Sequence, residues 1–201
     1  LQGDMTRSCH TIAPTLHQRE AMSTVSSTHI THYREEGYCL IPNLIPQNSV
    51  EAARLRALEI GQQLAPWPSG HLQVLDLELY RSENDTHLPV GIQRPASQET
   101  VFANVADHPN LAKAMAALLG DPVKRFTDQI GIKHGTLNEA QGGCSYYHQD
   151  SYYWKIAPEL GCNCWIPLTS VGIDASALAI MPKTHQGWQL VEHESYYDDP
   201  P

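Results

Sequence analysis

The chain has 201 residues, enough for one domain with a sizeable core, and its 41% hydrophobic and 17% charged content is typical of a globular protein. Its net charge of −9 argues against nucleic acid or an anionic membrane as a partner, because both need a basic surface. No apolar run approaches the roughly 20 residues of a membrane span, and the N-terminus lacks the features of a signal peptide. The five dispersed cysteines favour reduced thiols, so we expect a cytoplasmic protein.

The polar, aperiodic stretch of residues 1–28 predicts a disordered tail, which leaves residues 29–201 as the domain. A short helix is expected from Thr31 to Glu36, where Gly37 stops it. A strand is then expected over Tyr38–Ile41, because Pro42 ends the apolar run that follows the glycine.

A second helix is expected to begin at Asn48, with Glu51 three residues later in a capping-box pattern. A third is expected to follow a capping Asp107 and to end at Gly120. Each helix carries apolar residues at helical spacing, which predicts its buried face. The predicted faces are Ala52, Leu55 and Leu58 in the second helix, and Leu111, Met115 and Leu118 in the third.

The remaining segments favour strands and long connections. Residues 81–98 contain Pro89, Gly91 and Pro95 and are predicted to be a loop, of a length often found in functional lids. After Pro122 the pattern changes from a period of 3.6 to a period of 2. Strands are expected at Val74–Leu79, around Phe126, Ile130 and Ile132, through the 144–154 segment, and over Trp165–Val171 and Ala177–Met181. Helices followed by antiparallel strands predict an α+β protein with a jelly-roll sheet pair.

The most informative motif is His148-Gln149-Asp150, inside a segment rich in tyrosine. On a strand, the side chains of His148 and Asp150 would point to one face and that of Gln149 to the other. One imidazole and one carboxylate supply two thirds of a facial 2-His-1-carboxylate site, which leaves positions on Fe(II) open for a co-substrate and O2. The motif therefore predicts a metal site, although an exposed strand pair would give the same pattern.

The pair Cys162-Asn-Cys164 could be half of another metal site. A second cysteine pair is missing from the sequence, and a spacing of one residue is not that of zinc knuckles. We therefore interpret these cysteines as buried small hydrophobic residues on a strand.

The order of these segments, from Tyr33–Ile45 through the His-Gln-Asp motif to Ala177–Gly187, resembles the phytanoyl-CoA dioxygenase family. The resemblance covers roughly residues 29–190. It implies a double-stranded β-helix (jelly-roll or cupin-like) core with flanking N-terminal helices. Lys183 stands where the family commonly has glycine, and Asp174-Ala-Ser176 replaces an acidic-Asn-Gly turn, so both departures affect loops rather than metal ligands.

The resemblance also implies a set of site residues. His148 and Asp150 would bind Fe(II), and no catalytic residue is expected beyond the metal ligands. Gln129 and Lys133, four residues apart on one predicted strand, match positions that contact the co-substrate 2-oxoglutarate, as does Trp165. Tyr153 and Trp154 would lie on the substrate side.

The third metal ligand of the family is a histidine late in the jelly roll, followed by an arginine that binds the far carboxylate of 2-oxoglutarate. Both are expected downstream of Pro201, so the C-terminal strands are expected to be missing from this chain. His185, in the Met-Pro-Lys-Thr-His-Gln-Gly segment, is predicted not to be an iron ligand, because it lies in a turn.

These interpretations favour a non-haem Fe(II)/2-oxoglutarate-dependent dioxygenase that uses O2 to hydroxylate an unactivated C–H of a small molecule. Two alternatives remain open: a cupin-type metal-dependent isomerase or hydrolase, and a non-catalytic jelly-roll binding module. Metal binding without 2-oxoglutarate turnover would indicate the cupin-type enzyme. A histidine followed by an arginine downstream of Pro201 would favour the dioxygenase over the binding module. The substrate and the oligomeric state do not follow from the sequence.

Overall fold

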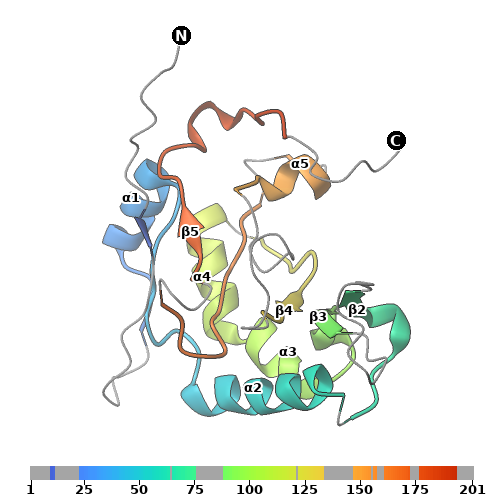
Figure 1. The fold of residues 1–201 in the computed structure, drawn as a ribbon. Helices are drawn as coiled ribbons and strands as arrows, with labels where there is room; N and C mark the ends of the chain where they lie inside the picture. The colour runs from blue at the N-terminus through green and yellow to red at the C-terminus, as the bar shows by residue number, and fades with distance from the viewer. Residues whose placement is uncertain are drawn as a thin grey trace.

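The computed structural model describes residues 10–11, 23–63, 65–75, 88–120, 122–133, 147–154, 156–157, 161–172 and 177–193. Helices and short antiparallel strands are mixed along the chain (Figure 1), in agreement with the predicted α+β class. Among the described helices, none combines the length and apolar character required to cross a membrane. The elements are β1 (His10–Thr11), α1 (Ser27–Glu36), α2 (Gln47–Gly61), β2 (Leu72–Leu75), β3 (Leu88–Gln93), α3 (Thr100–Ala106), α4 (Pro109–Leu119), β4 (Gln129–Gly131), α5 (Asp150–Trp154) and β5 (Ala179–Ile180), with short 3-10 turns η1 (Ser69–His71), η3 (Pro95–Ser97) and η6 (Gln186–Trp188).

A three-stranded antiparallel sheet has the order β2-β3-β4, and β1 pairs with β5 separately. Strand β3 lies inside the stretch predicted to be a loop, so that prediction was wrong. Pro89 is tolerated in this central strand because the register shifts between Gln73 and Val74, where Val74 pairs with Pro89. A bulge removes the need for the N–H that proline lacks.

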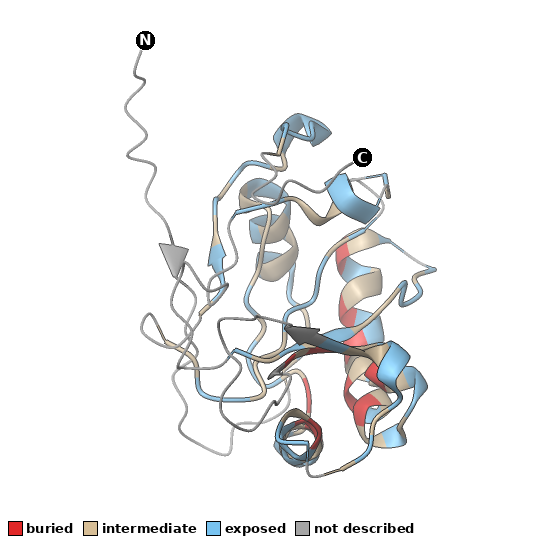
Figure 2. Ribbon diagram, turned by 45° about the vertical axis from the view of Figure 1, so that its right-hand side comes forward, coloured by how far each residue is buried: buried red, intermediate tan, exposed pale blue. Residues whose placement is uncertain are grey.

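The core lies between this sheet and the helices on one of its faces. Ile92 of β3 is fully buried (0% exposed), and Ile60 of α2 and Phe102 of α3 pack in the same cluster. Figure 2 shows the buried residues concentrated on the helices and on the adjacent strand. The Trp67 and Phe102 rings meet edge to face, with their centroids 5.9 Å apart.

Helix α2 buries a different face from the one predicted. Ala53, Ala57 and Ile60 are buried, whereas Leu55 and Leu58 are 50% and 40% exposed. The Arg56 guanidinium binds Glu99, the residue before α3, at 2.6 and 2.8 Å. This ion pair and the small alanine side chains allow α3 to pack closely against α2. The contact determines which face of α2 is buried.

The helix starts also differ from the predicted ones. Helix α1 begins at Ser27 behind a capping box in which Ser26 and His29 exchange hydrogen bonds, so it begins within the predicted tail. Helix α2 follows Pro46 and has no side-chain cap. Glu51, assigned to a capping box, instead forms an ion pair with Arg54 at 2.6 Å.

Helix α4 keeps most of its predicted features. Its N-terminal cap is His108, whose Nδ1 accepts a hydrogen bond from the Asn110 amide, and not Asp107. Leu111 and Leu118 are buried as predicted, while the third buried residue is Ala114. Met115 is only partly buried, packed against the core.

The C-terminal half contains less strand than predicted. Residues 161–172, with the predicted strand Trp165–Val171, have no regular structure, and neither has Tyr38–Ile41. The predicted strand Ala177–Met181 is reduced to β5, and that at Val74–Leu79 to β2, with residues 76–79 outside the described part of the chain.

Two alanine variants test which face of α2 is buried. Ile60→Ala is expected to lower the free energy of unfolding by about 2–5 kcal/mol, because Ile60 is 1% exposed and its removal leaves a cavity. Leu55→Ala, on the half-exposed face, is expected to change it by about 0.5 kcal/mol or less. Urea denaturation measures both, and equal losses would restore the face predicted from the sequence.

Candidate metal centre

The His148 and Asp150 side chains meet, although not on a strand. Residues 147–149 have no regular structure, and Asp150 is the first residue of α5, so the predicted strand was wrong. An acidic residue is favoured in the first turn of a helix, because the helix dipole is positive there. The entry into α5 brings His148 Nε2 to 3.3 Å from Asp150 Oδ1.

The spacing of these donor atoms fits one metal ion. Two donors that each lie about 2.1 Å from an ion, at right angles to one another, are about 3 Å apart. The side chains are 43% and 29% exposed, so the pair is accessible from solvent. In the described part of the chain, no group of three His, Cys, Asp or Glu side chains gathers to hold a metal. The separation of the two donor atoms therefore fits two adjacent ligands of a facial site.

Asn163 fixes the Asp150 carboxylate. Its Nδ2 donates to Asp150 Oδ2 at 2.7 Å, which leaves Oδ1 directed toward His148. Hydrogen bonds of this kind orient metal-binding carboxylates and raise metal affinity. The sequence interpretation treated the Cys162-Asn-Cys164 segment only as packing and missed Asn163. The one sequence feature that marks Asn163 is its position as a polar amide between two cysteines.

Gln149 and His193 join the motif to the C-terminal segment. The Gln149 side-chain amide donates to the carbonyl of Gln189 at 3.2 Å and accepts from the Val191 amide at 2.8 Å. The Gln149 backbone N–H donates to His193 Nε2 at 2.8 Å, so His193 Nδ1 carries the proton that bonds the Val191 carbonyl. These contacts place residues 189–193 beside the candidate centre.

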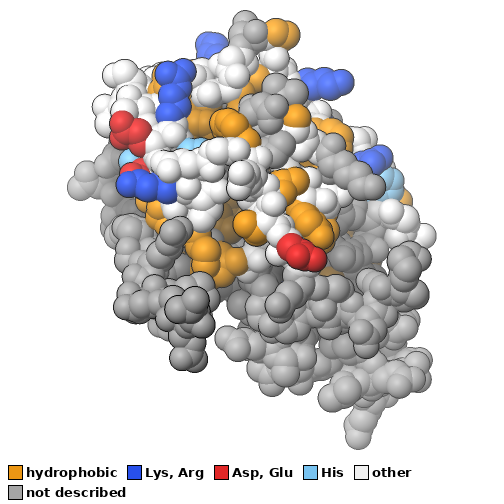
Figure 3. Space-filling view, turned by 90° about the horizontal axis from the view of Figure 1, so that it is seen from above, with side chains coloured by type: hydrophobic (Ala, Val, Ile, Leu, Met, Phe, Trp, Pro, Cys, Tyr) orange, Lys and Arg blue, Asp and Glu red, His pale blue; other side chains and the backbone are white. Residues whose placement is uncertain are grey.

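Aromatic side chains surround the pair. The Tyr153 ring lies edge-on to the His148 ring at 6.1 Å, and Tyr152 stacks on His193 at 4.2 Å. Trp154 lies farther along α5, beside Phe126 at 6.1 Å. Figure 3 views the molecule from the end at which α5 lies and shows hydrophobic side chains at the surface. The structure thus brings Tyr153, a predicted substrate residue, next to the side chains of His148 and Asp150.

The predicted co-substrate residues lie on other elements. Gln129 is exposed on β4, where its side chain accepts a hydrogen bond from Gln93 of β3 at 3.4 Å. Lys133 follows β4 and is exposed, and Trp165 is 39% exposed in the irregular segment 161–172. Strand β4 pairs with β3, and the His148–Asp150 motif is not part of the described sheet β2-β3-β4.

His185 belongs to a turn that caps the C-terminal end of α1. Its Nε2 lies 2.9 Å from the Arg34 carbonyl, and its Nδ1 packs against Gly37. The Lys183 amide donates to the Glu36 carbonyl at 2.9 Å, and the two side chains form an ion pair. These contacts give His185 a structural role at the end of α1, and its exclusion as an iron ligand stays a prediction.

The described cysteines are free thiols. Cys162 lies 3.5 Å from the Met115 sulfur, and burial raises the pKa of its thiol, so the proton is retained at neutral pH. Burial and the neighbouring Cys162 also raise the pKa of Tyr33. The interpretation of Cys162 as a packing residue therefore agrees with the structure, whereas Cys164 is exposed. The two cysteines do not lie on a strand, contrary to the prediction.

The close contact between Gly37 and His185 gives a stability prediction. Gly37 has a φ of 88°, and a Cβ there would lie 2.5 Å from His185 Nδ1. Gly37→Ala should lower the free energy of unfolding by more than about 1 kcal/mol. Gly120→Ala is the control, since Gly120 has a φ of 98° and no atom within 4 Å of the added Cβ.

We expect Gly37→Ala to be the costlier variant in urea denaturation, and His185→Ala to recover part of its loss in the double variant. Strictly additive losses would show that the turn does not pack on α1 in solution.

Comparison with known proteins gives the family. The family model described as "Phytanoyl-CoA dioxygenase (PhyH)" matches residues 33–200. A Caenorhabditis elegans protein named "Probable phytanoyl-CoA dioxygenase" is 23% identical over 176 residues, an alignment that covers 86% of this chain. The chain spans 56% of that relative's length. No solved structure matches the chain. Because the family model covers well over half of the residues, the chain belongs to the phytanoyl-CoA dioxygenase family.

Proposed function

We propose that the protein is a non-haem Fe(II)/2-oxoglutarate-dependent dioxygenase that hydroxylates an unactivated C–H of a small molecule. The observation that carries the proposal is the convergence of His148 Nε2 and Asp150 Oδ1 at 3.3 Å in a member of this family. When bound, Fe(II) would supply the oxidising chemistry, with 2-oxoglutarate and O2 as co-substrates.

The residues around the pair each have a distinct task in this proposal. His148 and Asp150 bind the ion, and Asn163 holds the carboxylate in one orientation through its 2.7 Å hydrogen bond. Tyr153, edge-on to His148, and Trp154 line the substrate side and limit the access of water. Gln149 keeps residues 189–193 beside the centre through its backbone and side-chain hydrogen bonds.

The co-substrate is assigned to Gln129, Lys133 and Trp165. An amide, an ammonium and an indole can together donate to carboxylates and enclose a small dicarboxylate. Their exposure in the structure leaves them accessible to a ligand. The assignment rests on the family resemblance.

A double-stranded β-helix core is part of the same proposal. The sheet β2-β3-β4, with helices on one face, would form part of the jelly roll. The third iron ligand, a histidine, and the arginine for 2-oxoglutarate are those that the family resemblance implies. We further propose that the protein acts in the cytosol, where its free thiols remain reduced.

The metal assignment predicts an order of affinities. His148→Ala and Asp150→Ala should lose Fe(II) binding, because each removes a ligand. Asn163→Ala should bind Fe(II) about 10- to 100-fold more weakly, because it frees the carboxylate without removing a ligand. Anaerobic Fe(II) titration of the folded variants measures this, with Asn104→Ala, an exposed asparagine of α3, as the matched control. If His148→Ala bound iron as tightly as the wild type, the site would be wrong.

The reaction class is tested by 2-oxoglutarate turnover. We expect Fe(II)- and O2-dependent formation of succinate and CO2 by the wild type, and none by Asp150→Ala. Metal binding without 2-oxoglutarate turnover would favour a cupin-type isomerase or hydrolase. The absence of both would favour a binding module.

Lys133→Met tests the co-substrate assignment. The variant keeps most of the side-chain length and removes its charge, so it should weaken 2-oxoglutarate binding by about 1.5–3 kcal/mol, roughly ten- to a hundredfold. Lys124→Met, at another exposed lysine, controls for the change in net charge. Calorimetry on the metal-loaded protein gives the affinities, and an unchanged value would remove Lys133 from the site.

A further inference from the structure

The backbone of Gln149 lies between the two candidate metal ligands. Its carbonyl accepts a hydrogen bond from the Tyr152 amide at 3.0 Å, so helix α5 begins directly after Gln149. The angle between the His148 and Asp150 side chains therefore depends on the orientation of this one residue. The first N–H groups of a helix have no acceptor within the helix and need a partner elsewhere, and the N–H of Gln149 is one of them.

His193 supplies this partner from 44 residues away in the sequence. Its Nε2 accepts a hydrogen bond from the Gln149 backbone N–H at 2.8 Å. In a capping box, a side chain at the third helical position performs the same task. The third residue of α5 is Tyr152, and its ring instead stacks on the ring of His193, with the centroids 4.2 Å apart. Tyr152 thus orients the histidine that caps the helix in its place.

The ring of His193 is also held on its other sides. Its Nδ1 donates to the Val191 carbonyl at 2.8 Å, and the Tyr153 ring lies edge-on at 5.4 Å. Both ring nitrogens are therefore engaged, one as a donor and the other as an acceptor. These contacts fit a residue that orients its neighbours and not one that binds a metal ion.

The Gln149 side chain strengthens the attachment of the segment that carries His193. The side-chain amide donates to the Gln189 carbonyl at 3.2 Å and accepts from the Val191 amide at 2.8 Å. Residues 189–193 have no regular structure of their own. Displacement of this segment from Gln149 would break three hydrogen bonds together, which keeps His193 in place.

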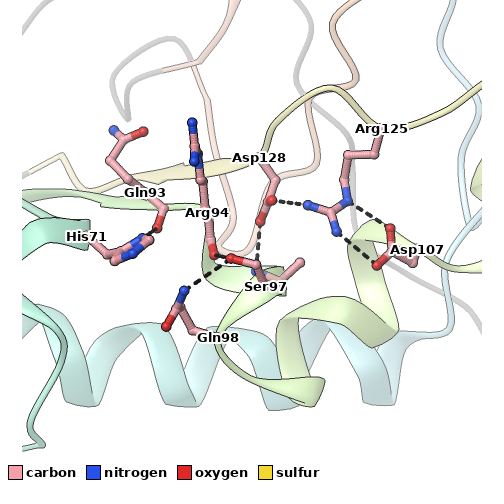
Figure 4. Close-up of polar contacts among 9 residues, drawn as sticks. His71, Gln93, Arg94, Ser97, Gln98, Asp107, Arg125 and Asp128 are labelled. Carbon is pink, nitrogen blue, oxygen red and sulfur yellow. Dashed lines mark hydrogen bonds and ion pairs between the residues drawn. The ribbon is translucent and has the colours of Figure 1, made fainter.

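A contact of the same kind occurs in another part of the fold. Asp128 accepts a hydrogen bond from the Ala96 amide at 2.8 Å, across 32 residues, and forms an ion pair with Arg125 (Figure 4). This contact joins the turn η3 to the residue that precedes β4. It provides a reference for a side chain that holds a distant backbone N–H and stabilises the fold.

We propose that His193 is a positioning residue for the proposed metal centre. By accepting the Gln149 N–H, it fixes the backbone between the ligands so that His148 Nε2 and Asp150 Oδ1 lie 3.3 Å apart, a separation that fits one ion. Asn163 orients the carboxylate of the same pair, so the two residues act on different parts of the centre. The inference rests on the proposed function, because it takes His148 and Asp150 as the ligands.

The test compares two substitutions of His193 in Co(II) titrations of the full chain, followed by calorimetry and by the visible absorption of the bound ion. His193→Phe keeps a flat ring that can stack on Tyr152 and removes the acceptor. His193→Gln keeps an acceptor at a similar distance from the backbone and removes the ring. His148→Ala shows how much of the binding belongs to the candidate pair.

Two controls separate positioning from general stability. His32→Phe makes the same substitution at an exposed histidine of α1. Asp128→Ala removes the hydrogen bond to the Ala96 amide, so it should lower the stability measured by urea denaturation. Both folded controls should bind Co(II) with the affinity of the wild type.

We expect His193→Phe to bind Co(II) about three- to tenfold more weakly than the wild type, which corresponds to the loss of one hydrogen bond. Its absorption spectrum should also change, because the two ligands are no longer held in one arrangement. His193→Gln should recover most of the affinity and the spectrum. Wild-type affinity in both His193 variants would overturn the inference. Equal losses in both would overturn it as well, because they would assign the effect to the ring and not to the acceptor.

The inference and the proposed function can fail separately. Loss of Co(II) binding in His148→Ala, with unchanged affinity in His193→Phe, would overturn the inference and leave the proposed metal centre intact. Co(II) binding that persists in His148→Ala would overturn the proposed centre and the inference with it.

Discussion

The Asp150 carboxylate is the constraint on which the candidate centre depends. One of its oxygens lies 3.3 Å from His148 Nε2, and the other accepts a 2.7 Å hydrogen bond from Asn163. Because Asn163 lies in the irregular segment 161–172, this bond joins that segment to the start of α5. A carboxylate held in this way presents a single donor atom in a fixed direction, as a metal site requires.

The two faces of the sheet β2-β3-β4 differ in polarity. The helices α2 and α3 bury Ile92 and its neighbours, so this side is closed and apolar. The other side carries the amides of Gln73, Gln93 and Gln129, which hydrogen-bond to one another across the strands. The His148–Asp150 pair lies on neither face of this sheet. It lies beside residues 189–193, which Gln149 binds through three hydrogen bonds.

The predictions succeeded where local signals decide the structure. Gly37 and Gly120 end helices α1 and α4 as predicted, because their positive φ angles favour glycine. The face of α2 and the strand β3 were mispredicted, because an ion pair to Glu99 and a bulge opposite Pro89 depend on distant residues. The side chains of His148 and Asp150 lie close together as predicted, but at the start of a helix and not on a strand. Both local structures can bring together residues that are two apart. Asn163 depends on a contact across 13 residues, which spacing alone does not reveal.

The central claim is that His148 and Asp150 hold the metal, and paramagnetic broadening by Mn(II) locates the ion directly. In NMR spectra recorded during a substoichiometric Mn(II) titration, the signals of Tyr153 and Asn163 should broaden first, because both side chains contact the pair. The signals of α3, which lies at the opposite end of the molecule from α5 (Figure 1), should broaden later. Broadening centred on another part of the chain, with Tyr153 and Asn163 unchanged, would contradict the account.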